Sequence, residues 1–200
     1  MDGTAPAVVA RAQRGDHDAF RILVERHSRA VFRVAYRLTG HQQDAEDVVQ
    51  DTFLRAFRQI GKFEARSSFA TWIYRIAFNC SHDLLRQRPR TAKHTSLDAE
   101  PREGGALQLA DPTPARDPYR QLESTEIDRR IREGLAGLSE LERAAFVLRH
   151  FEGQSIEQIG KALGLRASAT KHSVFRAVQK MRAALATAQA GVAAPQDSRT

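Results

Sequence analysis

Residues Ser155–Arg182, SIEQIGKALGLRASATKHSVFRAVQKMR, contain two amphipathic helical patterns separated by a break at Gly164. Ser155 and Gln158 have the spacing of a capping box, which predicts the start of the first helix. Ser168 is a candidate N-cap of the second helix. The apolar residues that recur at helical spacing are Ile156, Ile159, Ala162 and Leu163 in the first helix and Val174, Val178, Met181 and Leu185 in the second. This pattern predicts a helix-turn-helix, which places its second helix in the major groove of DNA.

The polar residues of the second helix suit contact with DNA. The apolar stripe leaves a set of cations and hydrogen-bonding groups on or near the outward side, namely Lys171, His172, Ser173, Arg176 and Lys180. Such groups reach phosphates and base edges. An ordinary helical hairpin with solvated charges is the alternative, because short patterns of this kind recur by chance.

The whole chain is basic, with a formal net charge of +7 over 200 residues. Lys and Arg outnumber Asp and Glu by 15 to 9 over residues 10–90 and by 11 to 7 over residues 126–186, whereas residues 91–125 carry 4 against 6. Two basic blocks thus flank an acidic one. Basic blocks favour a polyanionic partner through counterion release, although a solvated surface would also explain them. Nucleic acid is the favoured partner.

The first basic block begins with an apolar helical stripe over residues 8–38, which is broken at Gly15-Asp16 and ends at Thr39-Gly40. Asp44 follows as a candidate N-cap of another helix. One side of that helix is polar except for a single Leu, and consists of Asp47, Gln50, Asp51, Leu54 and Arg58. An apolar residue within a polar face indicates a protein-binding surface, but a lone exposed Leu is also common.

A further helix is expected from Phe69 to about Arg88, after the loop Phe63–Ser68. Its first half is rich in aromatic residues, and its end is basic. Rings stack on bases while guanidinium groups hold the backbone, so this combination suits a single strand of nucleic acid. Packing in a core is the alternative for the aromatic residues, which are usually buried when they recur at helical spacing.

Residues 91–125 have a different composition, with four prolines, the pair Gly104-Gly105 and no sustained periodicity, which predicts a disordered linker. A second helical block follows, in which Ser139 and Glu142 again have capping-box spacing. No strand-like alternation of useful length is present. We therefore expect an all-α protein with two small helical domains, residues 10–90 and 126–186, joined by a flexible linker and flanked by disordered ends, residues 1–9 and 187–200.

The sequence lacks the residues that several classes of chemistry need. Cys80 is the only cysteine, and the seven histidines show no metal-ligand spacing, so neither a disulfide nor a metal site is expected. No glycine-rich phosphate loop and no oriented nucleophile and base are found, so we expect a non-enzyme without a cofactor. The chain also lacks a signal-peptide core and any run of about 18 apolar residues, which predicts a cytoplasmic protein without membrane insertion.

The order and spacing of four motifs resemble the extracytoplasmic-function (ECF) group of sigma-70 family RNA polymerase sigma factors. The motifs are Gly15-Asp16 with Ala19-Phe20, DAEDVVQDTFLRAF over residues 44–57, FATWIYRIAFNCSHDLLR over residues 69–86, and LSELERAAFVLRHFEGQSIEQIGKALGL over residues 138–165. The resemblance covers residues 10–186. It implies that the first helical domain is sigma-2-like and the second is sigma-4-like, with the linker in place of an intermediate domain.

The resemblance also implies the partners and the sites. The partners are core RNA polymerase, promoter DNA and, in many members of the family, an anti-sigma factor, which nothing in this chain identifies. The core polymerase would bind Asp47, Gln50, Asp51 and Leu54. The −10 element would be opened and held by Phe63, Arg66, Ser67, Asn79, Arg86 and Arg88. The −35 element would be read by Ser168, Thr170, Lys171, His172, Ser173 and Arg176.

One segment departs from the commonest family pattern. Family members often have Thr-Val-Lys-Ser-Arg where this chain has Ala169-Thr170-Lys171-His172-Ser173. The loss of Arg at position 173 removes a bidentate reader of guanine, so the resemblance does not carry the usual −35 preference over to this chain, although Lys171 and Arg176 still match.

Two other classes of protein remain as alternatives. A stand-alone helix-turn-helix regulator would explain the basic charge, but neither the aromatic helix nor the face around Leu54. An enzyme acting on nucleic acid would need a metal or carboxylate cluster that the sequence does not contain.

Overall fold

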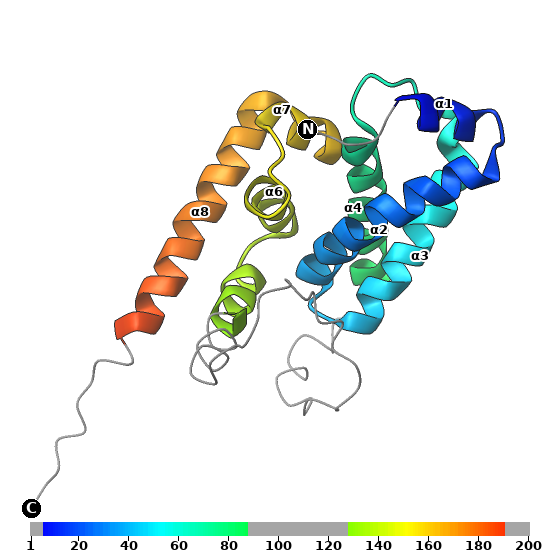
Figure 1. Cartoon of the computed structure of the whole chain (residues 1–200). Helices are drawn as coiled ribbons and strands as arrows, with labels where there is room; N and C mark the ends of the chain where they lie inside the picture. The colour runs from blue at the N-terminus through cyan, green and yellow to red at the C-terminus, as the bar shows by residue number, and fades with distance from the viewer. Residues whose placement is uncertain (1–5, 88–127, 191–200) are drawn as a thin grey trace, which may run out of the picture.

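The computed structural model describes residues 6–87 and 128–190, and every regular element in these two ranges is helical (Figure 1). The first range contains α1 (Pro6–Gln13), α2 (His17–Thr39), α3 (Gln42–Gln59), the short 3-10 helix η1 (Ile60–Lys62) and α4 (Phe69–Gln87). The second contains a helix over residues 128–136, followed by α6 (Glu140–His150), α7 (Ile156–Leu163) and α8 (Ala167–Ala190). The all-α prediction is confirmed for the described ranges.

The ends of α2 form as the sequence predicts. Asp16 is the N-cap, and its carboxylate accepts a hydrogen bond from the backbone N–H of Ala19. Gly40 ends the helix with a φ of 80°, a left-handed conformation that favours glycine. The start of α3 differs from the prediction, because the N-cap is His41 rather than Asp44. Asp44 lies instead in the first turn, where its charge still favours the positive end of the helix dipole.

The core of the first unit lies between α2, α3 and α4. These helices contribute side chains that are almost fully buried, including Leu23, Val31, Val34, Val48 and Ile73. Each comes from the apolar stripe of its helix, so hydrophobic burial explains the three-helix packing. Thr52 is buried among them as well, because it lies four residues after Val48 on the same face of α3.

The second unit is built from two capped helices and the long α8. Capping boxes form at Ser139 with Glu142 and at Ser155 with Gln158, as predicted. Gly164 ends α7 with a φ of 67°. α8 begins at Ala167, so Ser168 lies inside its first turn and is not the N-cap that the sequence suggested.

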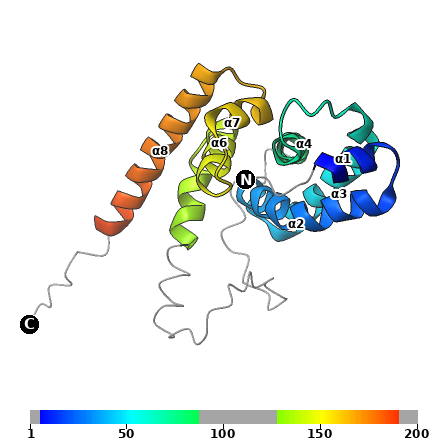
Figure 2. The same ribbon diagram turned by 45° about the horizontal axis from the view of Figure 1, so that its top comes forward.

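The two units pack against each other, with α6 and α7 lying between α8 and the α2–α4 bundle in both Figure 1 and Figure 2. Glu152 lies at the centre of this contact, and its side chain is only 4% exposed. Arg33 donates two hydrogen bonds to its carboxylate, at 3.0 and 2.9 Å, and the Tyr74 hydroxyl donates a third at 3.0 Å. Arg37 stacks on the ring of Phe151 at 3.9 Å.

The predicted domain boundaries need two corrections. Residues 6–9 are not disordered, because they begin α1, where Val9 is buried against the core. Residues 187–190 are likewise helical and extend α8. The predicted linker over residues 91–125, the outer parts of both predicted disordered ends, and Arg88 lie outside the described residues.

Candidate nucleic-acid interface

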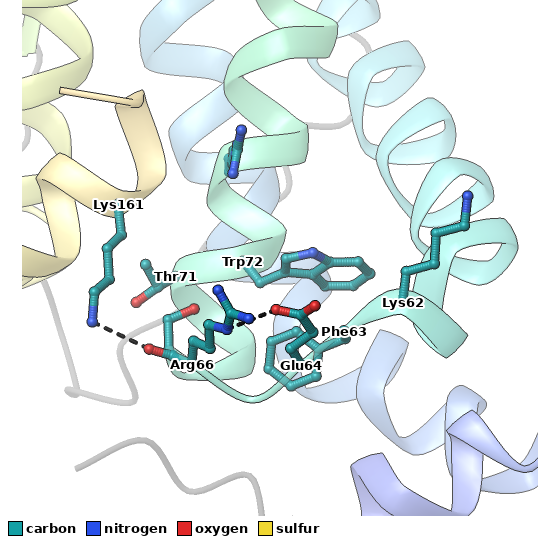
Figure 3. A pocket seen from close by; sticks show the side chains of 9 residues that line it. Lys62, Phe63, Glu64, Arg66, Thr71, Trp72 and Lys161 are labelled. Atoms are coloured by element: carbon teal, nitrogen blue, oxygen red, sulfur yellow. Dashed lines mark hydrogen bonds and ion pairs between the residues drawn. The ribbon is translucent and has the colours of Figure 1, made fainter.

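A pocket of about 430 Å³ opens beside the start of α4. Most of its lining comes from the segment between η1 and the second turn of α4, and one side chain comes from α7 (Figure 3). The lining residues are Lys62, Phe63, Glu64, Arg66, Ser67, Thr71, Trp72, Arg75 and Lys161.

The loop that forms this pocket is tied to the rest of the unit. The side-chain amide of Gln13 donates hydrogen bonds to the carbonyls of Ile60 and Phe63, at 3.2 and 2.6 Å. The Phe63 ring is buried and packs against Trp72, with ring centroids 5.2 Å apart. Ala65 adopts a left-handed backbone with a φ of 55°, which is uncommon for a residue other than glycine. The rings and hydrogen bonds therefore hold the loop in one defined path.

Cations dominate the charge around the pocket. Its lining includes Lys62, Arg66, Arg75 and Lys161, against the single carboxylate of Glu64. Glu64 forms an ion pair with Arg66 at 2.7 Å, and the Lys161 ammonium donates a hydrogen bond to the Arg66 carbonyl at 3.2 Å (Figure 3). A positively charged pocket beside aromatic rings suits a base together with its backbone phosphates.

The structure brings together only part of the first predicted DNA-binding set. Phe63, Arg66 and Ser67 all line the pocket, although Phe63 is buried and packs mainly with neighbouring rings. Asn79 and Arg86 are exposed farther along α4 and do not line it.

Six of the nine lining residues are outside the predicted −10 set, namely Lys62, Glu64, Thr71, Trp72, Arg75 and Lys161. Arg75 could have been found, because it lies three residues after Trp72 and four before Asn79, on one helical face. Lys62 directly precedes the predicted loop. Lys161 gave no local signal, since it reaches the pocket from the other unit.

The first turns of α8 form a second exposed surface. Ser168, Lys171, His172 and Arg176 are exposed as predicted, and Ser173 is half-buried. The prediction that Thr170 contacts DNA is wrong, because its side chain is fully buried and its hydroxyl donates to the Arg166 carbonyl at 3.0 Å. Phe175 was missed, although it is 61% exposed and lies between the predicted cations.

The polar face of α3 is a third surface. Asp47, Gln50, Asp51 and Leu54 are all exposed and share one side of the helix, with Leu54 at 47%. Phe57 was missed, although it is 46% exposed and one turn beyond Leu54. Arg55 connects this face to α4, through ion pairs with Asp51 at 3.3 Å and Asp83 at 3.0 Å. An apolar patch within acidic and polar groups suits a protein partner.

The two units coincide with two known protein families. Residues 23–91 match the family described as Sigma-70 region 2, and residues 128–181 match Sigma-70 region 4. The chain is also 33% identical over 180 residues to the RNA polymerase sigma-H factor of Pseudomonas aeruginosa, covering 89% of this chain and 92% of that protein. The chain belongs to the ECF sigma factors of the sigma-70 family. It is therefore an alternative sigma factor, which binds core RNA polymerase and directs promoter recognition, DNA melting and the initiation of transcription.

Other relatives of this sigma factor support the same family assignment. The ECF RNA polymerase sigma-E factor of Haemophilus influenzae is 33% identical over 178 residues, covering 87% of this chain and 91% of that protein. The solved structure of CnrH in complex with the cytosolic domain of CnrY has a TM-score of 0.66 at 27% identity, covering 90% of this chain and 96% of CnrH. The first unit is thus region 2, and the second is region 4.

Within residues 6–87 and 128–190, none of the helices has both the length and the hydrophobicity of a membrane span. In the same ranges, no group of three or more potential ligands is placed to hold a metal ion.

Proposed function

We propose that this sigma factor uses its three exposed surfaces for three separate contacts in transcription initiation. The α3 face, consisting of Asp47, Gln50, Asp51 and Leu54, binds core RNA polymerase. The basic pocket beside α4 holds the separated −10 strand. The first turns of α8 contact the −35 element. The observation that carries this assignment is the separation of an acidic and apolar face on α3 from basic faces on α4 and α8.

The −10 assignment is supported by the chemistry of the pocket. The pocket has a volume of about 430 Å³, lies beside an aromatic cluster and is lined by three cations of the first unit, Lys62, Arg66 and Arg75. Bases that leave a duplex need a stacking surface and a positive groove for the backbone. Asn79 and Arg86 extend this polar surface along α4, and we assign them to the same strand.

The −35 assignment is supported by the exposure of α8. Lys171 and His172 lie in the first turns of this helix, which enter the groove in helix-turn-helix proteins, so we propose them as readers of bases. Arg176 lies two turns beyond the start, and we propose it as a phosphate contact. Buried Thr170 is excluded from this set.

An anti-sigma partner, the absence of an enzymatic step and the location are also proposals. CnrH is solved with the cytosolic domain of CnrY, and the comparable fold of this chain supports an anti-sigma partner for it as well. The protein functions without an enzymatic step of its own, in the cytoplasm where bacterial RNA polymerase acts. The alternative of a stand-alone regulator is not favoured, because both units match sigma-70 families and a sigma factor aligns with 89% of this chain.

Binding to core polymerase provides the first test. The double substitution Asp51→Arg and Leu54→Ala should abolish co-elution with core enzyme in size-exclusion chromatography, while helicity measured by circular dichroism stays unchanged. The reason is that it removes an exposed carboxylate and the apolar side chain beside it. Glu133→Arg is the matched control, since this side chain is 51% exposed in the helix over residues 128–136, which belongs to the other unit. Unchanged co-elution of the double variant would remove the α3 face from the proposal.

A further inference from the structure

Glu142 is a buried carboxylate that joins the first turn of α6 to the middle of α8. Its side chain is only 6% exposed. It accepts a hydrogen bond from the Ser139 backbone N–H at 3.0 Å, which completes the capping box of α6. The same carboxylate forms ion pairs with Arg176 at 3.1 Å and Lys180 at 2.7 Å. A capping box needs only the first of these contacts, so the two ion pairs with α8 require a separate explanation.

The two cations are spaced to fix the position of α8. Arg176 and Lys180 are four residues apart, so they lie on the same side of the helix in successive turns. One carboxylate that binds both of them restrains rotation and sliding of α8 against α6. Because Glu142 is buried and charged, removal of its charge leaves both cations without their partner in the described structure.

Arg176 remains available to DNA while Glu142 holds it. The contact to Glu142 is made by Nε, and the Arg176 side chain is 61% exposed. Within residues 6–87 and 128–190, no other contact engages its two terminal amino groups. Guanidinium groups bind phosphate through this terminal edge. The terminal edge of the Arg176 guanidinium is therefore held at a defined position on α8, where it can bind phosphate.

We infer that Glu142 is a positioning residue for recognition of the −35 element, because it holds the Arg176 guanidinium at a set place relative to α6 and α8. Phosphate contacts fix the register of a protein on the duplex, and base contacts depend on that register. A mobile Arg176 still attracts phosphate but no longer sets the register. This inference rests on the proposed −35 function of α8 and adds a residue outside the DNA-contacting surface.

The test compares Glu142→Gln in two backgrounds of the full-length protein, assembled with core polymerase. Holoenzyme affinity is measured for a −35 sequence that the wild type selects from a randomised library, and for a scrambled −35 sequence. Glu142→Gln keeps the size of the side chain and an acceptor for Ser139, so the α6 cap survives. In the Glu142→Gln holoenzyme, the ratio of the affinities for the selected and the scrambled sequence should fall about five- to tenfold. This fall corresponds to roughly 1 to 1.4 kcal/mol. In the Arg176→Ala background, the same change should alter the preference less than about twofold.

Two further variants distinguish the positioning of Arg176 from the mere presence of a negative charge and from general destabilisation of the fold. Glu142→Asp keeps the charge but shortens the reach, and it should also lose preference; it carries the test if Glu142→Gln lowers helicity. Glu133→Gln is the matched control, because this side chain is 51% exposed and pairs with Arg129 in its own helix. It should leave the preference unchanged.

Specific outcomes would overturn the inference. Equal losses from Glu142→Gln with and without Arg176 would show a structural role that does not act through Arg176. Wild-type preference in Glu142→Gln, or in Glu142→Asp, would show that holding Arg176 does not matter for recognition. Failure of the wild-type holoenzyme to select any −35 sequence would instead contradict the proposed function of α8, so the two failures are distinguishable.

Discussion

Gly160 lies in α7 where that helix meets the start of α8. A Cβ at this position would lie 2.9 Å from the Leu165 carbonyl oxygen and 3.1 Å from the Thr170 hydroxyl. Alanine normally stabilises a helix interior by about 1 kcal/mol relative to glycine. Here the first neighbour is backbone, which cannot move without distorting the turn, and overpacking costs about 1 to 3 kcal/mol. The crowding should therefore outweigh the gain in helix propensity.

We expect Gly160→Ala to lower the free energy of unfolding by about 1 to 2 kcal/mol, measured by thermal or urea unfolding. Gly61→Ala is the control, since a Cβ there meets nothing within 4 Å and its backbone is not left-handed. It should be neutral or slightly stabilising. Equal stability of the two variants would mean that the turn after α7 relaxes to admit a methyl group.

Glu142 makes the stability of region 4 depend on pH in the acidic range. The hydrogen bond from Lys180 is the main cause that lowers the pKa of Glu142 from its ordinary value of 4.5. A lowered pKa in the folded state means that the ionised carboxylate stabilises the fold above the ordinary value. This stabilisation is lost as the pH falls through the lowered pKa.

The expected result is a difference between two melting curves. The wild type should have a higher Tm than Glu142→Gln at about pH 6, and this difference should shrink as the pH falls towards about pH 3. Circular dichroism on both proteins across this range provides the measurement. A difference in Tm that stays constant with pH would indicate that Glu142 stabilises the fold by packing rather than by charge.

At the scale of the elements, α4 combines a buried face with an exposed polar face. Phe69, Ile73 and Ala77 are buried in the core, whereas Arg75 and Asn79 are exposed. The buried face fixes the direction of the helix, and the exposed face then continues the basic pocket away from its loop. This geometry supports the proposal that a separated strand follows α4.

Arg75→Ala and Asn79→Ala should each reduce strand opening more than they reduce binding to closed duplex. The reason is that both side chains lie on the face assigned to the separated strand. Permanganate reactivity of thymines in the −10 region, measured with holoenzyme, reports the opening. Arg21→Ala removes a cation that is 70% exposed on α2, and it should leave the reactivity unchanged. Normal opening in both α4 variants would place the strand elsewhere.

At the scale of the whole molecule, regions 2 and 4 are in direct contact, although the proposed DNA sites are far apart on a promoter. Elements about 25 base pairs apart are separated by about 85 Å at 3.4 Å per base pair. A fully extended chain over residues 91–125 reaches about 115 to 125 Å, so the sequence between the regions is long enough for this span. We therefore expect the contacts around Glu152 to break when both elements are bound.

We expect Glu152→Gln to loosen the contact between the two regions in the free protein. The change weakens a bidentate interaction with Arg33 and a hydrogen bond from Tyr74 at a nearly buried site, which together stabilise the contact by about 1 to 3 kcal/mol. Small-angle X-ray scattering should show a larger radius of gyration. Glu157→Gln removes a 77% exposed carboxylate from α7 and should leave the radius unchanged. An unchanged radius for Glu152→Gln would show that apolar packing alone holds the regions together.

The sequence by itself determined the features that depend on neighbours a few residues away. The capping boxes at Ser139 and Ser155, the glycine ends at Gly40 and Gly164, and the apolar stripes could all be read locally. These signals are local because capping and helical periodicity involve residues three or four positions apart. They were enough to predict two helical units, a helix-turn-helix and the exposed face around Leu54.

Only the tertiary structure decided which distant side chains meet. Lys161 reaches the pocket of region 2, Glu142 binds two cations of α8, and buried Glu152 joins the two regions. Thr170 has a polar side chain in the predicted DNA-reading segment, yet the close packing of α8 against Gly160 buries it. Helical periodicity gives the direction of a side chain relative to its own helix. The rotation and approach of two packed helices depend on contacts along their whole length, so no short stretch of sequence encodes these pairs.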